Sequence, residues 1–261
     1  MEITTTTPLT FQGDASKTAK CTLATGDVVF RKSGAPETIA REVYQLQNLT
    51  NSSRVLRTPQ LVDFGDDWLA TSWMDGQNLA EQFAMTDSAT RRRDLCEQFG
   101  HVLGASIAIA SRLPEPSDPF DAMFEQLECL MHTDGKRVVS DQDAYIQNRV
   151  LGDVWREISE DANAVIPEIR FMQGDWCLPN VLTNDAAASS VLGGIVDWSE
   201  AGWMDWRFCV ADGLWSIGYN SRLAGIDARE LQIAFLDACE LDVTDPGLIW
   251  CRKIRALMAL I

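Results

Sequence analysis

The sequence predicts an α+β fold in two lobes, a small strand-rich lobe followed by a larger, mainly helical one. In the first 75 residues, short runs of β-branched and aromatic residues alternate with turns, and one stretch has helical periodicity. From Asp87 onward, long segments with apolar residues at helical spacing dominate. We therefore expect residues 1–74 to form the N-terminal lobe and residues 75–261 the C-terminal lobe, with a hinge beginning near Asp75.

Within the N-terminal lobe, the apolar patterns define four elements. A β-branched and aromatic run predicts a strand at 28–30, ending in Arg31 and Lys32 and followed by a turn that contains Gly and Pro. Apolar residues at helical spacing predict a helix over 37–49. Two further runs, 61–64 and 68–74, predict a strand pair because Gly65, Asp66 and Asp67 form a turn between them.

The C-terminal lobe shows helical periodicity in several segments, separated by a linker with three prolines. A Gly- and Asp-rich stretch between these helices is strand-like. We expect helices from residue 87 to about residue 109 and at 124–131, 144–158, 228–240 and 248–261, the linker at 112–119, and the strand-like stretch at 170–197.

Composition and charge exclude several classes of partner. The chain has 261 residues, of which 46% are hydrophobic and 23% charged, an ordinary globular composition. Its net charge of −16 argues against nucleic acid and against an anionic membrane surface. Neither a membrane-spanning apolar run nor a signal-peptide pattern occurs, so we expect a cytoplasmic protein, monomeric or homodimeric. The seven scattered cysteines are expected to be reduced.

Three polar residues carry a pattern typical of metal-dependent phosphoryl transfer. Asp175 is followed by Asn180 five residues later, and Asp197 ends a strand-like segment further on. Singly, an Asp beside a Gly can be a turn residue and an Asn after a Pro can be a helix cap. Together they suit catalysis, because one Asp can orient or deprotonate an attacking hydroxyl while the Asn and the second Asp offer hard oxygen ligands to Mg²⁺.

These segments resemble the motifs of the aminoglycoside phosphotransferase and choline kinase family. Its H-G-D-x-x-x-x-N motif stands here as Q-G-D-W-C-L-P-N at 173–180, and its I-D-W-x-x-A-G-x-x-D motif as V-D-W-S-E-A-G-W-M-D at 196–205. The resemblance implies a bilobal protein-kinase-like fold in which Asp175 is catalytic and Asn180 and Asp197 bind Mg²⁺. It implies transfer of the γ-phosphoryl group of ATP, with GTP as an alternative, to a hydroxyl of a small molecule.

The resemblance also implies nucleotide contacts in the N-terminal lobe. Residues 13–19, which include Ser16, are similar to the family's loop over the phosphates. Either Arg31 or Lys32 would reach the phosphates, and strand periodicity lets only one of them face the pocket. By similarity to the family's strand we favour Arg31. Glu42 would pair with that cation.

Residues 71–76 are similar to the family's hinge between the lobes. The backbone near Ser72 and Met74 would hydrogen-bond the adenine ring.

Two departures from the family motifs bear on catalysis. Gln173 stands where the family has His, and Cys209 stands where a second Asp lies four residues after the one matched by Asp205. Both positions support the catalytic loop in the family. This leaves an alternative, a weakly active or inactive pseudokinase that binds nucleotide. A Gln amide both donates and accepts hydrogen bonds, however, which favours a competent kinase.

A third departure concerns the acceptor. Family members that modify aminoglycosides often end in acidic residues, whereas this chain ends in a basic segment, 252–255, and an apolar tail. A cationic acceptor therefore needs other carboxylates. The candidates are Asp153, Glu157, Glu200 and Asp205.

Overall fold

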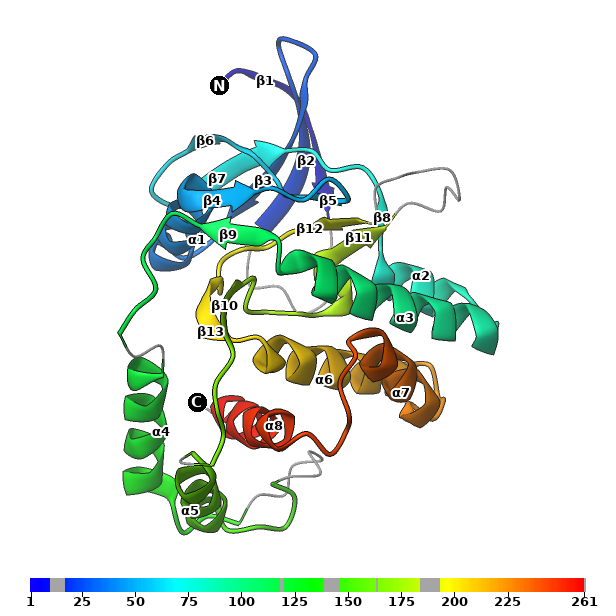
Figure 1. Ribbon diagram of the computed structural model, residues 1–261. Helices are drawn as coiled ribbons and strands as arrows, with labels where there is room; N and C mark the ends of the chain where they lie inside the picture. The colour runs from blue at the N-terminus through cyan, green and yellow to red at the C-terminus, as the bar shows by residue number, and fades with distance from the viewer. Residues whose placement is uncertain (10–16, 118–119, 139–145, 163, 184–192, 261) are drawn as a thin grey trace.

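The computed structural model describes residues 1–9, 17–117, 120–138, 146–162, 164–183 and 193–260, and confirms an α+β fold in two lobes (Figure 1). The N-terminal lobe is built on a five-stranded antiparallel sheet of strand order β1-β2-β3-β7-β6. Its strands are β1 (Ile3–Leu9), β2 (Lys17–Leu23), β3 (Val28–Ser33), β6 (Leu61–Phe64) and β7 (Trp68–Ser72). The strand predicted at 61–64 and the beginnings of those at 28 and 68 are confirmed.

Helix α1 (Pro36–Asn48) packs against this sheet and confirms the helix predicted over 37–49. Proline fits the first turn because the N–H it lacks has no partner within the helix there. Ile39 and Val43 lie in one apolar cluster with Leu69 of β7. Glu42 lies on the same buried face of the helix, so packing of the apolar stripe carries a carboxylate into the interior.

The described residues form three smaller sheets besides the five-stranded one. A four-stranded sheet of order β5-β12-β11-β8 joins β5 (Leu56–Arg57), β12 (Gly193–Ile195), β11 (Val181–Thr183) and β8 (Gln77–Asn78). The other two pair β4 (Leu49–Asn51) with β9 (Ile109–Ser111), and β10 (Ile169–Met172) with β13 (Gly202–Asp205). Strands β10 and β11 bracket residues 173–180, and β12 leads directly to Asp197. The strand-like stretch of the sequence is therefore the frame of the candidate site.

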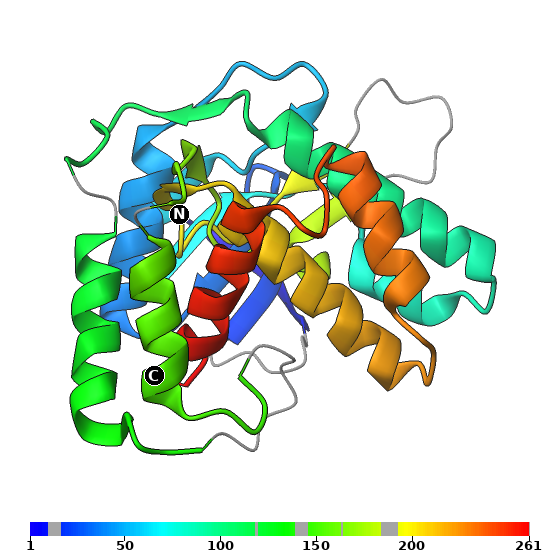
Figure 2. The same cartoon turned by 60° about the horizontal axis from the view of Figure 1, so that its bottom comes forward.

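The helical lobe has two apolar clusters. In the larger one, Phe99 stacks on both Trp176 and Phe235, which brings α3 and α7 against residues 173–180. In the second, Phe120, Phe208 and Trp250 pack together. The helices at 121–134, 151–161 and 246–258 lie next to one another in this part of the lobe (Figure 2). The helices are α2 (Leu79–Met85), α3 (Ala89–Ser106), α4 (Asp121–Asp134), α5 (Leu151–Asp161), α6 (Arg207–Leu223), α7 (Arg229–Ala238) and α8 (Pro246–Met258).

Helix α6 was not predicted. It is buried on nearly all sides through its first two turns, from Arg207 to Leu214, so it has no polar face to alternate with an apolar one. The prediction for 144–158 was wrong at its start, because Asn148 has a positive φ of 58° and Val150 pairs with Val138 before α5 begins. In the part of the chain that the structure describes, no helix has the length and apolar character needed to span a membrane.

Candidate active site

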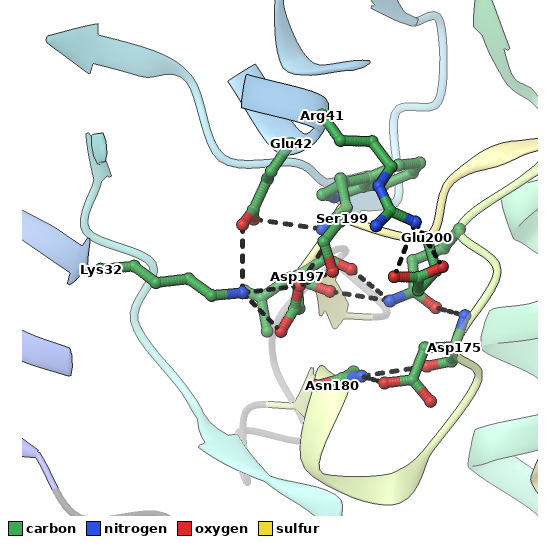
Figure 3. Close-up of polar contacts among 11 residues, drawn as sticks. Lys32, Arg41, Glu42, Asp175, Asn180, Asp197, Ser199 and Glu200 are labelled. Atoms are coloured by element: carbon green, nitrogen blue, oxygen red, sulfur yellow. Dashed lines mark hydrogen bonds and ion pairs between the residues drawn. The ribbon is translucent and has the colours of Figure 1, made fainter. Parts of the chain in front are cut away.

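The loop between β10 and β11 carries Asp175 and Asn180. The side chain of Trp176 is fully buried and stacks on Phe99, with the ring centroids 5.7 Å apart. The Leu178 N–H donates to Ser216 Oγ of α6 at 3.0 Å. Asn180 Nδ2 donates to both the carbonyl and the Oδ2 of Asp175, each at 2.9 Å (Figure 3). The part of the loop that follows Asp175 is thus anchored, and Asn180 orients the Asp175 carboxylate.

Gln173 ties this loop to the segment that carries Asp197. Its side chain is buried, and its Nε2 donates to the carbonyl oxygens of Val196, at 3.2 Å, and Asp197. Its Oε1 accepts the N–H of Asp175 at 3.0 Å. A carboxamide supplies the donor and the acceptor that these groups need, so Gln is chemically sufficient at the position where the family has His.

We expect Gln173→Glu to disrupt this connection although the side chains have nearly the same size. A carboxylate accepts hydrogen bonds only, so two carbonyl oxygens would face it without a donor, at a cost of about 1–3 kcal/mol or more. Chemical denaturation should measure this loss, and the transfer rate should fall with it. Gln60→Glu, at an exposed residue just before β6, is the matched control. Unchanged stability in Gln173→Glu would contradict the bridging role.

Gly174 is required by two independent features of the backbone. Its φ is +87°, in a region that residues with a side chain rarely adopt. A Cβ added at this position would lie 1.9 Å from the Glu200 carbonyl oxygen. The close approach of this carbonyl joins the catalytic loop to the segment after Asp197.

We expect Gly174→Ala to lower stability by at least about 1–3 kcal/mol and to reduce transfer more than 100-fold, because backbone must move beside Asp175. Gly26→Ala is a matched control, since Gly26 also has a positive φ, of 89°, but a Cβ added there would meet nothing within 4 Å. Thermal unfolding and transfer assays on both variants measure the difference. Equal effects in the two would show that the close contact at Gly174 is unimportant.

Lys32, Glu42 and Asp197 form a partly buried ionic cluster (Figure 3). Lys32 Nζ lies 3.0 Å from both carboxylate oxygens of Asp197 and 3.1 Å from Glu42 Oε2. Burial lowers the pKa of Lys32, but Glu42 and Asp197 outweigh this effect and raise it overall. Burial and Asp197 raise the pKa of Glu42, against the opposing effect of Lys32. The lysine is therefore held charged beside Asp197.

The preference for Arg31 over Lys32 is corrected by this geometry. Neighbouring strand residues face opposite sides of the sheet, and Lys32 is the one that faces Glu42 and Asp197. The guanidinium of Arg31 instead lies 5.0 Å from the centroid of the Trp68 ring. The expected pairing of Glu42 with a strand cation is present, with Lys32 as the cation.

The remaining nucleotide candidates are Ser72, Met74 and Ser16. The Ser72 N–H donates to the Gln60 carbonyl at 2.8 Å, so strand structure already uses this donor. Met74 is buried against Gly194, where a Cβ would lie 2.2 Å from Met74 Cε. Adenine recognition by this backbone therefore stays a prediction. Ser16 and most of the 13–19 loop lie outside the described residues.

The oxygen donors of Asn180 and Asp197 fit Mg²⁺. Asn180 uses its amide nitrogen on Asp175, which leaves the amide oxygen as a ligand, and Asp197 supplies a carboxylate. Mg²⁺ is commonly bound by one or two protein oxygen ligands together with substrate phosphates. Among the described residues, no three His, Cys, Asp or Glu side chains cluster to hold a metal by themselves. A metal here would therefore depend on the nucleotide.

The four carboxylates considered for a cationic acceptor all have partners within the chain. The pairs are Glu200 with Arg41 at 3.0 Å, Asp205 with Arg207 at 2.5 Å, Asp153 with Arg156 at 2.5 Å, and Glu157 with Lys253 at 3.2 Å and with Arg149. Asp205 is fully buried, so it is excluded as an acceptor contact. The other three are partly exposed but already paired.

The sequence analysis missed Asp212 and Arg255. Asp212 is buried on α6, and the Nε of Arg255 on α8 donates to its carboxylate. Burial raises the pKa of the Asp212 carboxyl to about 7, against the opposing effect of Arg255. The available signal was spacing, because Asp212 lies three residues, or nearly one helical turn, after Cys209.

A cluster of Lys32 and Glu42 from one lobe meets a loop Asp, an Asn and a second Asp from the other, which is the arrangement of a kinase-like phosphotransferase. The sequence over residues 10–238 matches the phosphotransferase enzyme family. The chain belongs to this family, and it is a small-molecule kinase that acts on a hydroxyl group.

Several solved structures share this kinase-like fold at low sequence identity. An aminoglycoside-3'-phosphotransferase of type VIII has a TM-score of 0.64 and 18% identity, covering 97% of this chain and 93% of that chain. A macrolide 2'-phosphotransferase from Brachybacterium faecium has a TM-score of 0.61 and 11% identity, covering 98% and 84%. A Plasmodium vivax ethanolamine kinase has a TM-score of 0.56 and 13% identity, covering 98% and 76%. Comparison with curated proteins gave no match.

Proposed function

We propose that this kinase transfers the γ-phosphoryl group of ATP to a small neutral acceptor, with the nucleotide between Lys32 and the loop of Asp175. The observation that carries the proposal is the approach of Lys32 Nζ to Asp197 at 3.0 Å, because it joins residues of both lobes beside the catalytic loop. ATP is favoured over GTP because an aminoglycoside phosphotransferase of the same fold was solved with ADP and hygromycin B.

Each residue has a role that follows from its contacts. Asp175, oriented by Asn180, would accept the proton of the acceptor hydroxyl or orient it. Lys32 would bind the phosphates, with Glu42 as its remaining anionic partner. Asn180 and Asp197 would hold Mg²⁺, which supplies positive charge to the phosphoryl group during transfer.

The two lobes have different proposed roles. Residues 1–74 would bind the nucleotide, and residues 75–261 would supply the catalytic loop and the acceptor site. The net charge of −16 supports a partner other than nucleic acid or an anionic membrane. A cytoplasmic location and a monomeric or homodimeric state stay predictions, the second of which light scattering would test.

An exposed aromatic pair on α6 favours a ring-bearing acceptor over a polycationic one. Trp215 lies three residues beyond Asp212 and stacks on Tyr219 with ring centroids 5.3 Å apart and an interplanar angle of 14°. Trp215 is 55% exposed although it is a large aromatic residue. Such a surface binds the apolar face of a ring, whereas the carboxylates suited to ammonium groups are ion-paired.

The test is a transfer assay with ATP or GTP, Mg²⁺ and a panel of neutral ring-bearing alcohols, aminoglycosides and amino alcohols. We expect ATP to be the better donor and a neutral acceptor to have the highest kcat/KM. Trp215→Ala should raise the KM of that acceptor about tenfold, in line with the loss of an aromatic contact worth about 0.5–1.5 kcal/mol beyond area burial, without changing the KM for ATP. Phe64→Ala, at another exposed aromatic, is the control.

Preference for polycationic acceptors would overturn the acceptor class and leave the kinase assignment in place. Absence of transfer to every acceptor, with ADP binding intact, would overturn the proposed reaction and favour the pseudokinase.

A further inference from the structure

The Asp197 carboxylate is held by a neutral donor as well as by Lys32. The Ser199 hydroxyl donates to Asp197 Oδ1 at 2.8 Å, and the Ser199 N–H lies 3.4 Å from the same oxygen (Figure 3). Ser199 is 8% exposed, whereas the side chain of Asp197 is 35% exposed. A buried hydroxyl therefore fixes one oxygen of a carboxylate that is partly open to solvent.

The backbone between the two residues keeps Ser199 in place. Asp197 has a positive φ of 56°, which an Asp tolerates better than most residues because its side chain can bond the backbone two residues on. Trp198 is buried, and its N–H donates to Glu42 Oε1 at 3.2 Å. Its indole N–H donates to the Ile195 carbonyl at 3.1 Å. These bonds anchor the turn, so the Ser199 hydroxyl has a defined position beside Asp197.

The two carboxylate oxygens of Asp197 are used unequally. Oδ1 accepts from Lys32 Nζ and from the Ser199 hydroxyl. Among the described residues, Oδ2 accepts from Lys32 Nζ alone. Each oxygen of a carboxylate has about two sites for hydrogen bonds or ligands, so Oδ1 is fully used and Oδ2 keeps one site.

The charge of each donor decides what Asp197 can still bind. Lys32 offsets the negative charge of the carboxylate, and the same lysine is proposed to bind the phosphates of the nucleotide. A hydroxyl orients the carboxylate without adding positive charge, so the attraction of Asp197 for a divalent cation is retained. Ser199 is thus the side-chain partner that can stay on Asp197 when Lys32 turns to the phosphates.

We propose that Ser199 is a positioning residue, whose hydroxyl occupies Asp197 Oδ1 and thereby presents Oδ2 as the oxygen that binds Mg²⁺. The inference rests on the proposed function for the presence of Mg²⁺ with the nucleotide. It is tested by a binding measurement, so it depends neither on the identity of the acceptor nor on the transfer step.

Calorimetry of ADP binding to the full-length protein, at a series of Mg²⁺ concentrations, measures this role. We expect Ser199→Ala to raise the Mg²⁺ concentration for half of the Mg²⁺-dependent gain in ADP affinity at least about fivefold, because a hydrogen bond to a charged group is lost. The ADP affinity without Mg²⁺ should stay within about twofold of wild type. Ser199→Thr keeps a hydroxyl and should restore the wild-type response. Ser199→Cys, with a weaker donor, should give an intermediate one.

Ser106→Ala is the matched control. Ser106 is 5% exposed at the end of α3, and its hydroxyl donates to the Leu103 carbonyl at 2.6 Å. Thermal unfolding should show a loss of stability in both alanine variants, because each loses a buried hydrogen bond. Only Ser199→Ala should change the response to Mg²⁺.

An unchanged Mg²⁺ response in Ser199→Ala or, where that variant does not fold, in Ser199→Cys would overturn the inference. So would an equal shift in Ser106→Ala, ADP binding by the wild type that does not respond to Mg²⁺, or failure of both Ser199→Thr and Ser199→Cys to improve on Ser199→Ala. Absence of transfer by a wild type whose ADP binding responds to Mg²⁺ defeats the proposed reaction instead and leaves the calorimetry to decide this inference.

Discussion

Asp175→Asn should reduce phosphoryl transfer about 100- to 10,000-fold, while ADP binding stays within a few-fold of wild type. The reason is geometric. Asn180 donates to Asp175 Oδ2 at 2.9 Å, so the carboxylate is held beside the proposed acceptor position and away from the Lys32 cluster. An Asn at 175 keeps the shape but has no negative charge with which to attract or accept the proton of the hydroxyl.

Steady-state transfer assays and calorimetry with ADP measure the two halves of this prediction. Asp153→Asn is the control, because Asp153 is an exposed carboxylate that pairs with Arg156 on α5. An Asp175→Asn protein that retains most of its turnover would remove Asp175 from the catalytic role. One that loses turnover and ADP affinity together would point to a collapsed loop.

Asp197→Asn should raise the Mg²⁺ concentration needed for half-maximal activity at least about tenfold, the largest shift in the Mg²⁺ requirement expected of any substitution. The substitution removes a negative charge from the proposed metal site and also removes one of the two anionic partners of Lys32. Asn180→Ala should have a smaller effect on the Mg²⁺ titration, because it removes a neutral oxygen ligand.

Glu42→Gln separates the two consequences of losing Asp197. It removes the other anionic partner of Lys32 and leaves Asp197 in place, so it should raise the KM for ATP without shifting the Mg²⁺ titration. Titration of activity with Mg²⁺ at saturating ATP, for all three variants, gives the comparison. Identical Mg²⁺ requirements in wild type, Asn180→Ala and Asp197→Asn would exclude both ligands.

Local sequence patterns were enough to predict the part of this protein that carries the catalytic motifs. Asp175, Asn180 and Asp197 lie on a short loop and the end of the next hairpin, where spacing along the chain determines proximity. The apolar stripe of α1 similarly predicted a helix that buries Glu42. The strand alternation at Arg31 and Lys32 predicted that only one would face the site, which is what the structure shows.

Which of these two cations faces the site depended on contacts distant in sequence. The choice is made by Glu42 and Asp197, ten and 165 residues away from Lys32. The same applies to the acidic residues considered for the acceptor, whose Arg and Lys partners include Arg41 for Glu200 and Lys253 for Glu157. No local pattern identifies such pairs, because ionic contacts form wherever packing brings opposite charges together.

The sequence by itself determined the class of fold and the catalytic motif of this protein, because both depend on periodicity and spacing over short stretches of the chain. Tertiary structure alone decided how the loop around Asp175 is held. Gln173 reaches the carbonyls of Val196 and Asp197, and Ser216 of α6, a helix without an amphipathic signal, accepts the Leu178 N–H. Asp212 on the same helix is buried and accepts a hydrogen bond from Arg255 of α8. A buried carboxylate needs a partner, and only the packing of α6 against α8 shows that Arg255 is that partner.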